Sequence, residues 1–325
     1  MRPSCGAESV SASDKPDWAA VAAGYSPRVQ IEVERQQLLE HRDRMLQLRA
    51  GNKVSAPPKL PPRPKVKLTG TTHLVVGDAH FHPGDPCPHR ATWLGRAITD
   101  LQPSVVIDIG DWWSCDSLNS FDRPGSKSFE GRRYHQDIDA GVLAQERVRE
   151  QLDDWNRGRR KASRLEPRMI RTLGNHEYRI DRVLEESPRL LGVIGTEDLL
   201  SREFGWEEIS FLEPILIDGI VYQHYFDKGG RAPGYSTKHL AANTLAQTHR
   251  TCVFGHTHRF DYFEEPAGNG KIQVVNAGCY FSHEEPYAGN DNKRWRRGLL
   301  VLRNVVNGRF DFEWLGMDVV EARYG

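Results

Sequence analysis

The chain has 325 residues, and its 44 Lys and Arg residues balance 44 Asp and Glu residues, so the formal net charge is zero. This balance excludes a uniformly basic nucleic-acid coat protein and a uniformly acidic tail protein. Hydrophobic residues make up 38% of the chain and charged residues 27%, which is typical of a folded protein rather than a disordered one.

Three further features indicate a cytoplasmic protein that does not enter a membrane. No apolar run approaches the roughly 20 residues of a membrane-spanning helix. The first residues lack the apolar core of a signal peptide. The chain has five cysteines, an odd number, and no C-x-x-C motif, so we expect reduced thiols rather than disulfide bonds.

The first 66 residues predict three consecutive segments. Residues 1–16 are rich in Ser and Ala and predict a disordered tail. Residues 17–50 predict a helical arm that packs on its own domain, on a second copy or on a partner, although a turn at Gly24 also allows a fragment of a DNA-binding helix-turn-helix. Residues 51–66 contain five prolines and predict an extended, semi-rigid linker.

The rest of the chain, 67–325, predicts one α/β domain in which strands alternate with helices. Mixed strands of this kind favour a layered sandwich of sheets flanked by helices. Residues 298–317 alternate like an antiparallel hairpin, with Asn307–Gly308 at the turn. The other predicted strands are 73–78, 104–111, 168–175, 214–224, 251–256 and 271–278, and the predicted helices are 92–101, 136–158 and 236–248.

The first five of these strands each end in Asp, Asn or His. Ligands of open α/β sheets bind beyond the carboxyl ends of strands, so one crevice could collect all of these side chains. Glycine precedes most of the blocks and lets the backbone turn tightly there. The side chains at the strand ends are Asp78, His80, Asp111, Asn175, His176, His224, His256 and His258.

The composition of these blocks indicates a metal site. Residues two apart on an extended segment point the same way, so Asp78 and His80 are placed to hold one cation. The carboxylate of Asp111 could bridge two cations, and Asn175 offers a neutral carbonyl oxygen. A mixed nitrogen and oxygen ligand set favours Mn, Fe or Zn over Ca or Mg.

Taken together, the blocks GDAH, GDWW, GNHE, the isolated His224 and GHTH resemble the calcineurin-like metallophosphoesterases over residues 72–280. VVNAG (274–278) is similar to the strand that usually follows the last block. The text around the third block resembles members that are met in bacteriophage genomes and are described as DNA-repair nucleases.

This resemblance implies a four-layer α-β-β-α sandwich of two mixed sheets, with the N-terminal helical arm added, and a dinuclear metal centre. It implies that Asp111 bridges the two ions and is catalytic in that role, and that His176 binds no metal and protonates the leaving oxygen. Metal one would be held by Asp78, His80, Asp111 and His258, and metal two by Asp111, Asn175, His224 and His256.

The implied activity is hydrolysis of a phosphoester by a hydroxide that bridges two divalent ions. Manganese is the first expectation for the metal, with Zn, Fe, Ni or Mg as alternatives. We expect a phosphodiesterase or nuclease acting on DNA, RNA or a nucleotide. The alternatives are a phosphomonoesterase, acting on phosphoproteins or nucleotides, and a DNA-binding or assembly protein that keeps the same fold.

Three segments bear on the substrate. Residues 112–135 form a long insertion that should overhang the site. Residues 157–171 are basic, although 157–164 could equally be a solvated helix end. Residues 293–297, KRWRR, place an aromatic ring among positive charges, as single-stranded nucleic-acid sites do. The candidate substrate contacts are His82, Arg179, Arg182, Arg294 and Trp295.

Two acidic residues beside the blocks have open roles. Asp108 could orient a ligand histidine, or it could pair locally within the strand. Glu177 could orient His176, or it could begin the following helix favourably.

Overall fold

The computed structural model describes residues 70–122, 125–234, 237–268 and 270–325. The predictions for the tail, the helical arm and the proline-rich linker therefore lie outside the described residues. The chain divides into two compact units, and the larger consists of 53–189 and 195–325. Of the smaller unit the structure describes only 190–194, a short turn.

Within the described residues, one sheet has six strands and is parallel in its middle. Its order is β11 (Arg309–Gly316), β10 (Gly298–Val306), β1 (Thr71–Val76), β2 (Val105–Asp108), β3 (Arg168–Thr172) and β4 (Trp206–Ile209). The strands β1 to β4 pair in parallel, and the hairpin β10–β11 adds antiparallel to β1. The predicted hairpin is confirmed, because the strands meet at Asn307–Gly308.

The second sheet is smaller and also mixed. Its order is β5 (Ile215–Ile217), β6 (Ile220–Tyr222), β7 (Cys252–Phe254), β9 (Gly270–Ala277) and β8 (Phe260–Ala267). The strands β6, β7 and β9 are parallel, and β5 and β8 are antiparallel edge strands.

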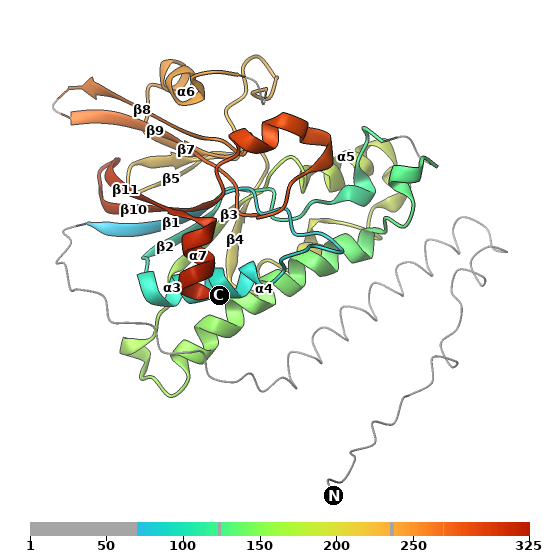
Figure 1. The fold of residues 1–325 in the computed structure, drawn as a ribbon, viewed down its shortest axis with the longest axis horizontal. Helices are drawn as coiled ribbons and strands as arrows, with labels where there is room; N and C mark the ends of the chain where they lie inside the picture. The colour runs from blue at the N-terminus through green and yellow to red at the C-terminus, as the bar shows by residue number, and fades with distance from the viewer. Residues whose placement is uncertain (1–69, 123–124, 235–236, 269) are drawn as a thin grey trace, which may run out of the picture. The chain divides into compact units, whose positions relative to one another are not determined.

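Three apolar clusters separate the layers of the molecule. Aliphatic residues of both sheets, such as Ile107 and Val275, form a core between the sheets. On the outer face of the six-stranded sheet a larger core packs against α3, α4 and α7, and on the outer face of the other sheet a smaller core packs against α6. The two sheets and their helices thus form the expected α-β-β-α layers (Figure 1).

The helices α3 to α6 lie between strands that pair in parallel or share a sheet, whereas α7 follows the last strand. They are α3 (Arg90–Leu101), α4 (Tyr134–Asn156), α5 (Tyr178–Glu186), α6 (Leu240–Thr248) and α7 (Met317–Tyr324), with short 3₁₀ turns at Asp116–Leu118, Lys127–Phe129, Lys161–Ser163, Pro188–Leu190, Thr196–Leu199 and Pro286–Arg294. Among the helices of the described ranges, none has both the length and the apolar character needed to span a bilayer.

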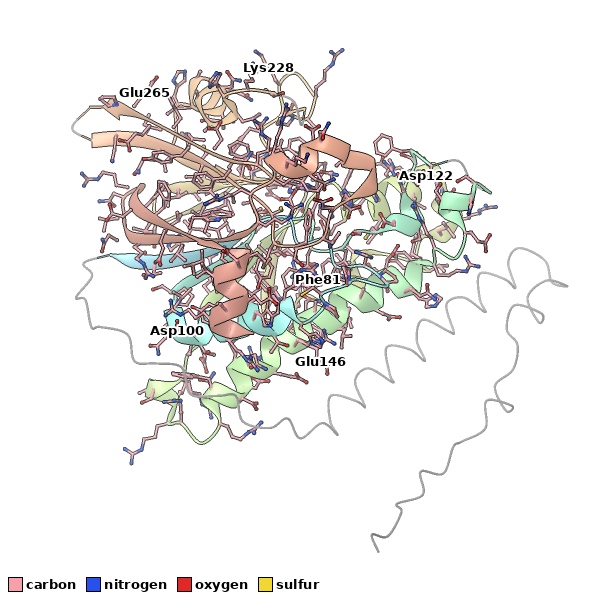
Figure 2. The ribbon with its side chains drawn as sticks, in the orientation of Figure 1. Phe81, Asp100, Asp122, Glu146, Lys228 and Glu265 are labelled. Carbon is pink, nitrogen blue, oxygen red and sulfur yellow. The ribbon has the colours of Figure 1, made fainter. Side chains whose placement is uncertain are left out.

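Most of the side chains after the strands are buried, while Asn175 and His176 are half-buried. Phe81, which follows the first histidine block, is 2% exposed and lies among densely packed side chains in Figure 2. Lys228 and Glu265 lie at the periphery of the same view. Each strand-end block therefore starts in the buried interior, at the edge of the sheet where its strand ends.

Candidate metal centre

The strand-end blocks meet at one edge of the two sheets. Asp78 follows β1 and Asp111 follows β2, while His224 follows β6 and His256 follows β7. Because each sheet is parallel at these strands, their carboxyl ends point to the same side. The predicted convergence of these side chains on one place is what the structure has.

One group of ligand atoms belongs to Asp78, His80 and His258. Their side chains are buried, and their ligand atoms lie within 4.8 Å of one another. The Nε2 atom of His258 lies 3.2 Å from Oδ2 of Asp78 and 3.1 Å from Nε2 of His80. This is the set that the sequence assigned to metal one, apart from Asp111.

A second group belongs to Asp111, His224 and His256, again with ligand atoms within 4.8 Å of one another. Oδ1 of Asn175 joins them, 3.0 Å from Nε2 of His224 and 2.7 Å from Nδ1 of His256. These four residues are those assigned to metal two.

Asp111 faces both groups. Its Oδ2 atom lies 3.4 Å from Nε2 of His224 and 3.9 Å from Nε2 of His80, and its Oδ1 accepts a hydrogen bond from the backbone N–H of His176. Burial would raise the pKa of Asp111, but His224 and His176 hold it well below its usual range. An ionised carboxylate between two ligand groups fits the predicted bridge.

The tautomer of His224 fits a bound cation. Its Nδ1 lies 2.9 Å from the backbone oxygen of Ile109, which can only accept, so Nδ1 carries a proton. In the neutral ring Nε2 is then an acceptor that faces another acceptor, Oδ1 of Asn175, at 3.0 Å. Burial opposes a second proton, but Asp111 raises the pKa of His224 to about 10. This place therefore takes a proton or a metal ion.

The backbone at the predicted ligands is strained. His80, Asp111, His256 and His258 have φ values of 47°, 55°, 71° and 58°, in the left-handed region that few residues other than glycine adopt and in which Asn, Asp and His are enriched. Such outliers persist only where the surroundings enforce them, and they cluster at functional sites. Four of the thirteen non-glycine residues with positive φ in the described ranges are predicted ligands.

Two glycines explain how the blocks approach one another so closely. A Cβ atom on Gly174 would lie 2.1 Å from Oδ1 of Asp111, and one on Gly255 would lie 2.4 Å from Oδ1 of Asp78. No larger residue fits at either place unless the predicted ligand moves. These glycines precede Asn175 and His256, and each makes room for an acidic residue of another block.

His176 lies beside the second group with a defined orientation. Its Nδ1 donates to the backbone oxygen of Ser114 at 2.6 Å, and its Nε2 lies 3.8 Å from Oδ2 of Asp111 and accepts from Nη2 of Arg179 at 3.2 Å. Burial lowers the pKa of His176, and Asp111 opposes that shift. The ligand atoms of His80, Asp111 and His176 also lie within 4.8 Å of one another, so its exclusion from metal binding stays a prediction.

Glu177 holds the loops around the site in place. It is fully buried, and its carboxylate accepts hydrogen bonds from the backbone N–H groups of Asp111, Trp113 and Gly174 at 2.8–3.0 Å. It therefore ties the loop after β2 to the loop after β3. The sequence placed this residue beside the site but did not indicate its three backbone partners, two of which, Asp111 and Trp113, lie in a distant block.

Asp108 pairs within its own sheet and not with a ligand histidine. Its Oδ2 atom lies 2.5 Å from Nε of Arg171 on the neighbouring strand, and its Oδ1 accepts from the backbone of Gly110. The bond from Gly110 is the local contact that the sequence left open, whereas the ion pair reaches Arg171, 63 residues further along the chain.

The candidate substrate residues lie at different distances from this chemistry. Arg179 is 6% exposed and donates to the backbone oxygens of Ser114 and Cys115 beside His176. Arg182 donates to the backbone oxygen of Leu118 in the inserted loop. His82 lies with Asp85 in the loop after β1. Contacts of these three with a substrate stay predictions.

The expectation of an exposed stacking ring in the KRWRR segment is wrong. Trp295 is 7% exposed, and its ring packs edge-on against His258 at a centroid distance of 4.6 Å and against Phe281 at 5.5 Å. Its aromatic character serves to support a predicted ligand. Arg294 is exposed and lies 3.3 Å from Asp291, so it is a surface charge.

The basic segment 157–164 follows the end of α4 and precedes β3, so it lies at the amino end of that strand, opposite the candidate site. Arg157 pairs with Asp154, and Arg159 lies 4.2 Å from the ring centre of Trp155. The segment behaves as the solvated helix end that the sequence allowed.

Comparisons with known proteins give only weak likenesses. No protein-family model matches the chain, and no curated protein matches it. One solved crystal structure is 14% identical with a TM-score of 0.29, and the match covers 75% of this chain and 98% of the other. The crystal structure of TT1561 of Thermus thermophilus is 11% identical with a TM-score of 0.28, covering 76% and 99%.

Proposed function

We propose that the chain is a phosphoester hydrolase that uses two divalent metal ions, and that its substrate is a phosphodiester in a nucleic acid or nucleotide. One observation carries the proposal. Asp111 faces two groups of buried ligand atoms at once, and each group contains at least two imidazoles. Two ions that share a carboxylate form the type of site that clamps a phosphoryl group for in-line displacement.

The resemblance of the five blocks to calcineurin-like metallophosphoesterases supports the same proposal from the sequence. The residues named by that resemblance are those whose ligand atoms converge. This agreement is useful because residue order along the chain and distance in space are separate observations. The in-class alternative, a phosphomonoesterase, has the same ligands and is distinguished by the experiment below.

When bound, the two ions would supply Lewis acidity for the phosphoryl oxygens and for a water molecule. The chain's own residues have other tasks. Asp78, Asp111 and Asn175 provide oxygen ligands, and the histidines provide nitrogen ligands. The ring of His224 is held by the hydrogen bond from its Nδ1 to the backbone oxygen of Ile109. The mixed set suits manganese, with Zn, Fe, Ni and Mg as alternatives.

His176 would donate a proton to the leaving oxygen from Nε2, since Nδ1 is already bound to the backbone of Ser114. A proton on Nε2 breaks its present hydrogen bond from Arg179, because both atoms would then be donors. The released guanidinium N–H groups are then available to a phosphate oxygen. Arg179 is therefore the candidate substrate contact that the geometry favours.

The test is hydrolysis of bis-p-nitrophenyl phosphate against p-nitrophenyl phosphate by metal-stripped protein with Mn²⁺ added back. We expect a preference for the diester and its loss in Asp111→Ala. A preference for the monoester would replace the diesterase with a phosphatase. No turnover of either, with metal bound, would contradict the proposal for these substrates and favour a binding protein.

The role of His176 is tested by changing the leaving group. Protonation matters little for p-nitrophenolate and much for a poor leaving group such as an alkoxide. His176→Gln should therefore lower the rate on the order of 10²–10⁴-fold for an alkyl phosphodiester and much less for the p-nitrophenyl ester. Equal losses on both substrates would assign His176 to metal binding instead.

A further inference from the structure

A separate group of potential ligands lies outside the two described above. His82 and Asp85 come from the loop between β1 and α3, and His283 comes from the loop after β9. Their ligand atoms lie within 4.8 Å of one another, and the rings of His82 and His283 are 5.3 Å apart. The two loops are far apart in the sequence, so their meeting is a product of the fold.

Both histidines have one nitrogen committed to a hydrogen bond. Nδ1 of His82 lies 2.9 Å from the backbone oxygen of Pro83, so Nδ1 donates and Nε2 keeps a lone pair. Nε2 of His283 lies 2.8 Å from a carboxylate oxygen of Glu285, so Nε2 donates there. A carboxylate behind an imidazole is the usual support of a metal-binding histidine.

The other nitrogen of His283, Nδ1, is free to accept a ligand. Nδ1 is buried, and no hydrogen-bond partner for it occurs among the described residues. Leaving a buried polar atom without a partner costs about 1–3 kcal/mol. A cation that accepts the lone pair of Nδ1 removes that cost. Packing of the two loops without a cation leaves the cost in place.

Asp85 is fixed in place from its far side. Its Oδ1 accepts from the backbone N–H of Cys87 at 2.8 Å, and its Oδ2 pairs with Arg90. A carboxylate keeps further lone pairs when it accepts two bonds, so Asp85 still has acceptor capacity. Arg90 balances Asp85, and Glu285 leaves the group with one negative charge when both histidines are neutral.

We propose that His82, Asp85 and His283 bind a third divalent cation, separate from the pair around Asp111. Two imidazoles and one carboxylate form a donor set that suits Zn²⁺, Mn²⁺ or Fe²⁺ and leaves positions open to water. The cation links the loop after β1 to the loop after β9.

This link has a consequence for the neighbouring centre. The ring of Phe281 packs 4.8 Å from that of His283 and 5.2 Å from that of His258, a predicted ligand of metal one. An ion held by His283 therefore fixes the aromatic wall against which His258 rests. The third site positions this wall and needs no contact with the reacting atoms.

The experiment counts metal ions in the full chain. The protein is stripped with a chelator, incubated with excess Zn²⁺, freed of unbound metal by gel filtration and analysed by elemental mass spectrometry. His82→Ala and His283→Ala should each bind about one ion per chain fewer than the wild type, because each loses a ligand. His135→Ala, in α4, is the matched histidine control and should not change the count.

Two results separate this proposal from the proposed function. In Asp111→Asn the third ion should remain, and adding His283→Ala to that variant should remove it. A count in both His82→Ala and His283→Ala equal to that of the wild type overturns the third site, whatever the protein hydrolyses. Loss of one ion in these variants supports it even if no phosphoester is turned over.

Discussion

Two buried polar clusters include residues at the end of β2 and in the loop after it, and they balance their charge differently. In the first cluster Arg171, which is fully buried, donates to Asp108 at 2.5 Å, to Gln145 at 2.6 Å and to Ser201 at 2.9 Å. In the second cluster Asp111 faces the imidazoles of the two ligand groups. The first cluster is balanced by a permanent cation of the chain, whereas the second is faced by imidazoles, which gain charge with a proton and could hold a metal ion.

The aromatic surroundings of Arg171 complete its cluster. Its guanidinium carbon lies 4.6–4.7 Å from three indole ring centres, which favours a desolvated cation. These rings belong to Trp112, Trp113 and Trp206. The comparison teaches that burial by itself does not indicate a metal site. A carboxylate such as Asp108 is satisfied by the chain, while Asp111 faces a place that takes a proton or an ion.

The largest expected effect comes from removing the internal cation. Arg171→Met leaves Asp108 buried without its partner, which should lower the free energy of unfolding by about 3–5 kcal/mol. The matched control is Arg168→Met on the same strand, whose exposed pair with Glu207 is worth about 0–1 kcal/mol. Urea unfolding of both variants checks this, and similar losses in the two would contradict the account of the Arg171 cluster.

The second prediction concerns the addition of a divalent metal ion to the cluster around Asp111. A divalent ion at about 100 times its dissociation constant should stabilise the metal-free protein by about 2.7 kcal/mol per site. Asp111→Asn should abolish most of this gain, because both ligand groups lose a charged member. Asp153→Asn, at an exposed position on α4, is the control and should keep the gain. The thermal midpoint with and without Mn²⁺ is the measurement.

The third prediction concerns the residue that joins the two clusters. Glu177 accepts from Asp111 on one side and from Trp113 on the other. Glu177→Gln turns an amide donor towards a backbone N–H, which should cost about 1–3 kcal/mol. It should also weaken metal binding, since the loop carrying Asp111 loses its anchor. If isothermal titration finds unchanged affinity in a destabilised variant, Glu177 supports the tryptophan side alone.

The smallest expected effect concerns Asp139, a carboxylate whose pKa is raised, whereas that of Asp111 is lowered. Burial raises the pKa of Asp139 on α4 to about 7. The pKa of Asp139 in the unfolded state is near 4, so the folded state keeps the proton to a higher pH. The free energy of unfolding therefore falls as the pH rises from about 4 to 7. Asp139→Asn should therefore be more stable than the wild type at pH 8 and similar at pH 4. Thermal melts at the two pH values check the sign.

The sequence predicted the parts of the fold that depend on local pattern. The strand runs, the hairpin at Asn307–Gly308 and the strand-end blocks each have a local signal, and parallel pairing then places the blocks at one edge. The edge strand β8 was missed because charged residues and Pro266 interrupt its alternation, and the short edge strand β4 was missed as well. The run 214–224, predicted as one strand, is two antiparallel strands, β5 and β6.

The supporting contacts of the site could not be predicted in the same way. Trp295 packs on His258, and Asp108 pairs with Arg171, each across a long stretch of sequence. No local periodicity carries such pairings, because they depend on which loops and strands become neighbours. Charge and aromatic content in KRWRR indicated an exposed platform, whereas tertiary packing made its ring part of the wall.

The left-handed backbone at His80, Asp111, His256 and His258 has a consequence for how the protein opens. Each such residue costs of order 1–3 kcal/mol, and together they concentrate unfavourable energy in loops at one edge of two well-packed sheets. These loops should exchange their amide hydrogens with solvent through local openings, long before the strands beneath them do. Ligation would close those openings, so the difference in exchange between metal-loaded and metal-free protein should trace the five blocks on the chain.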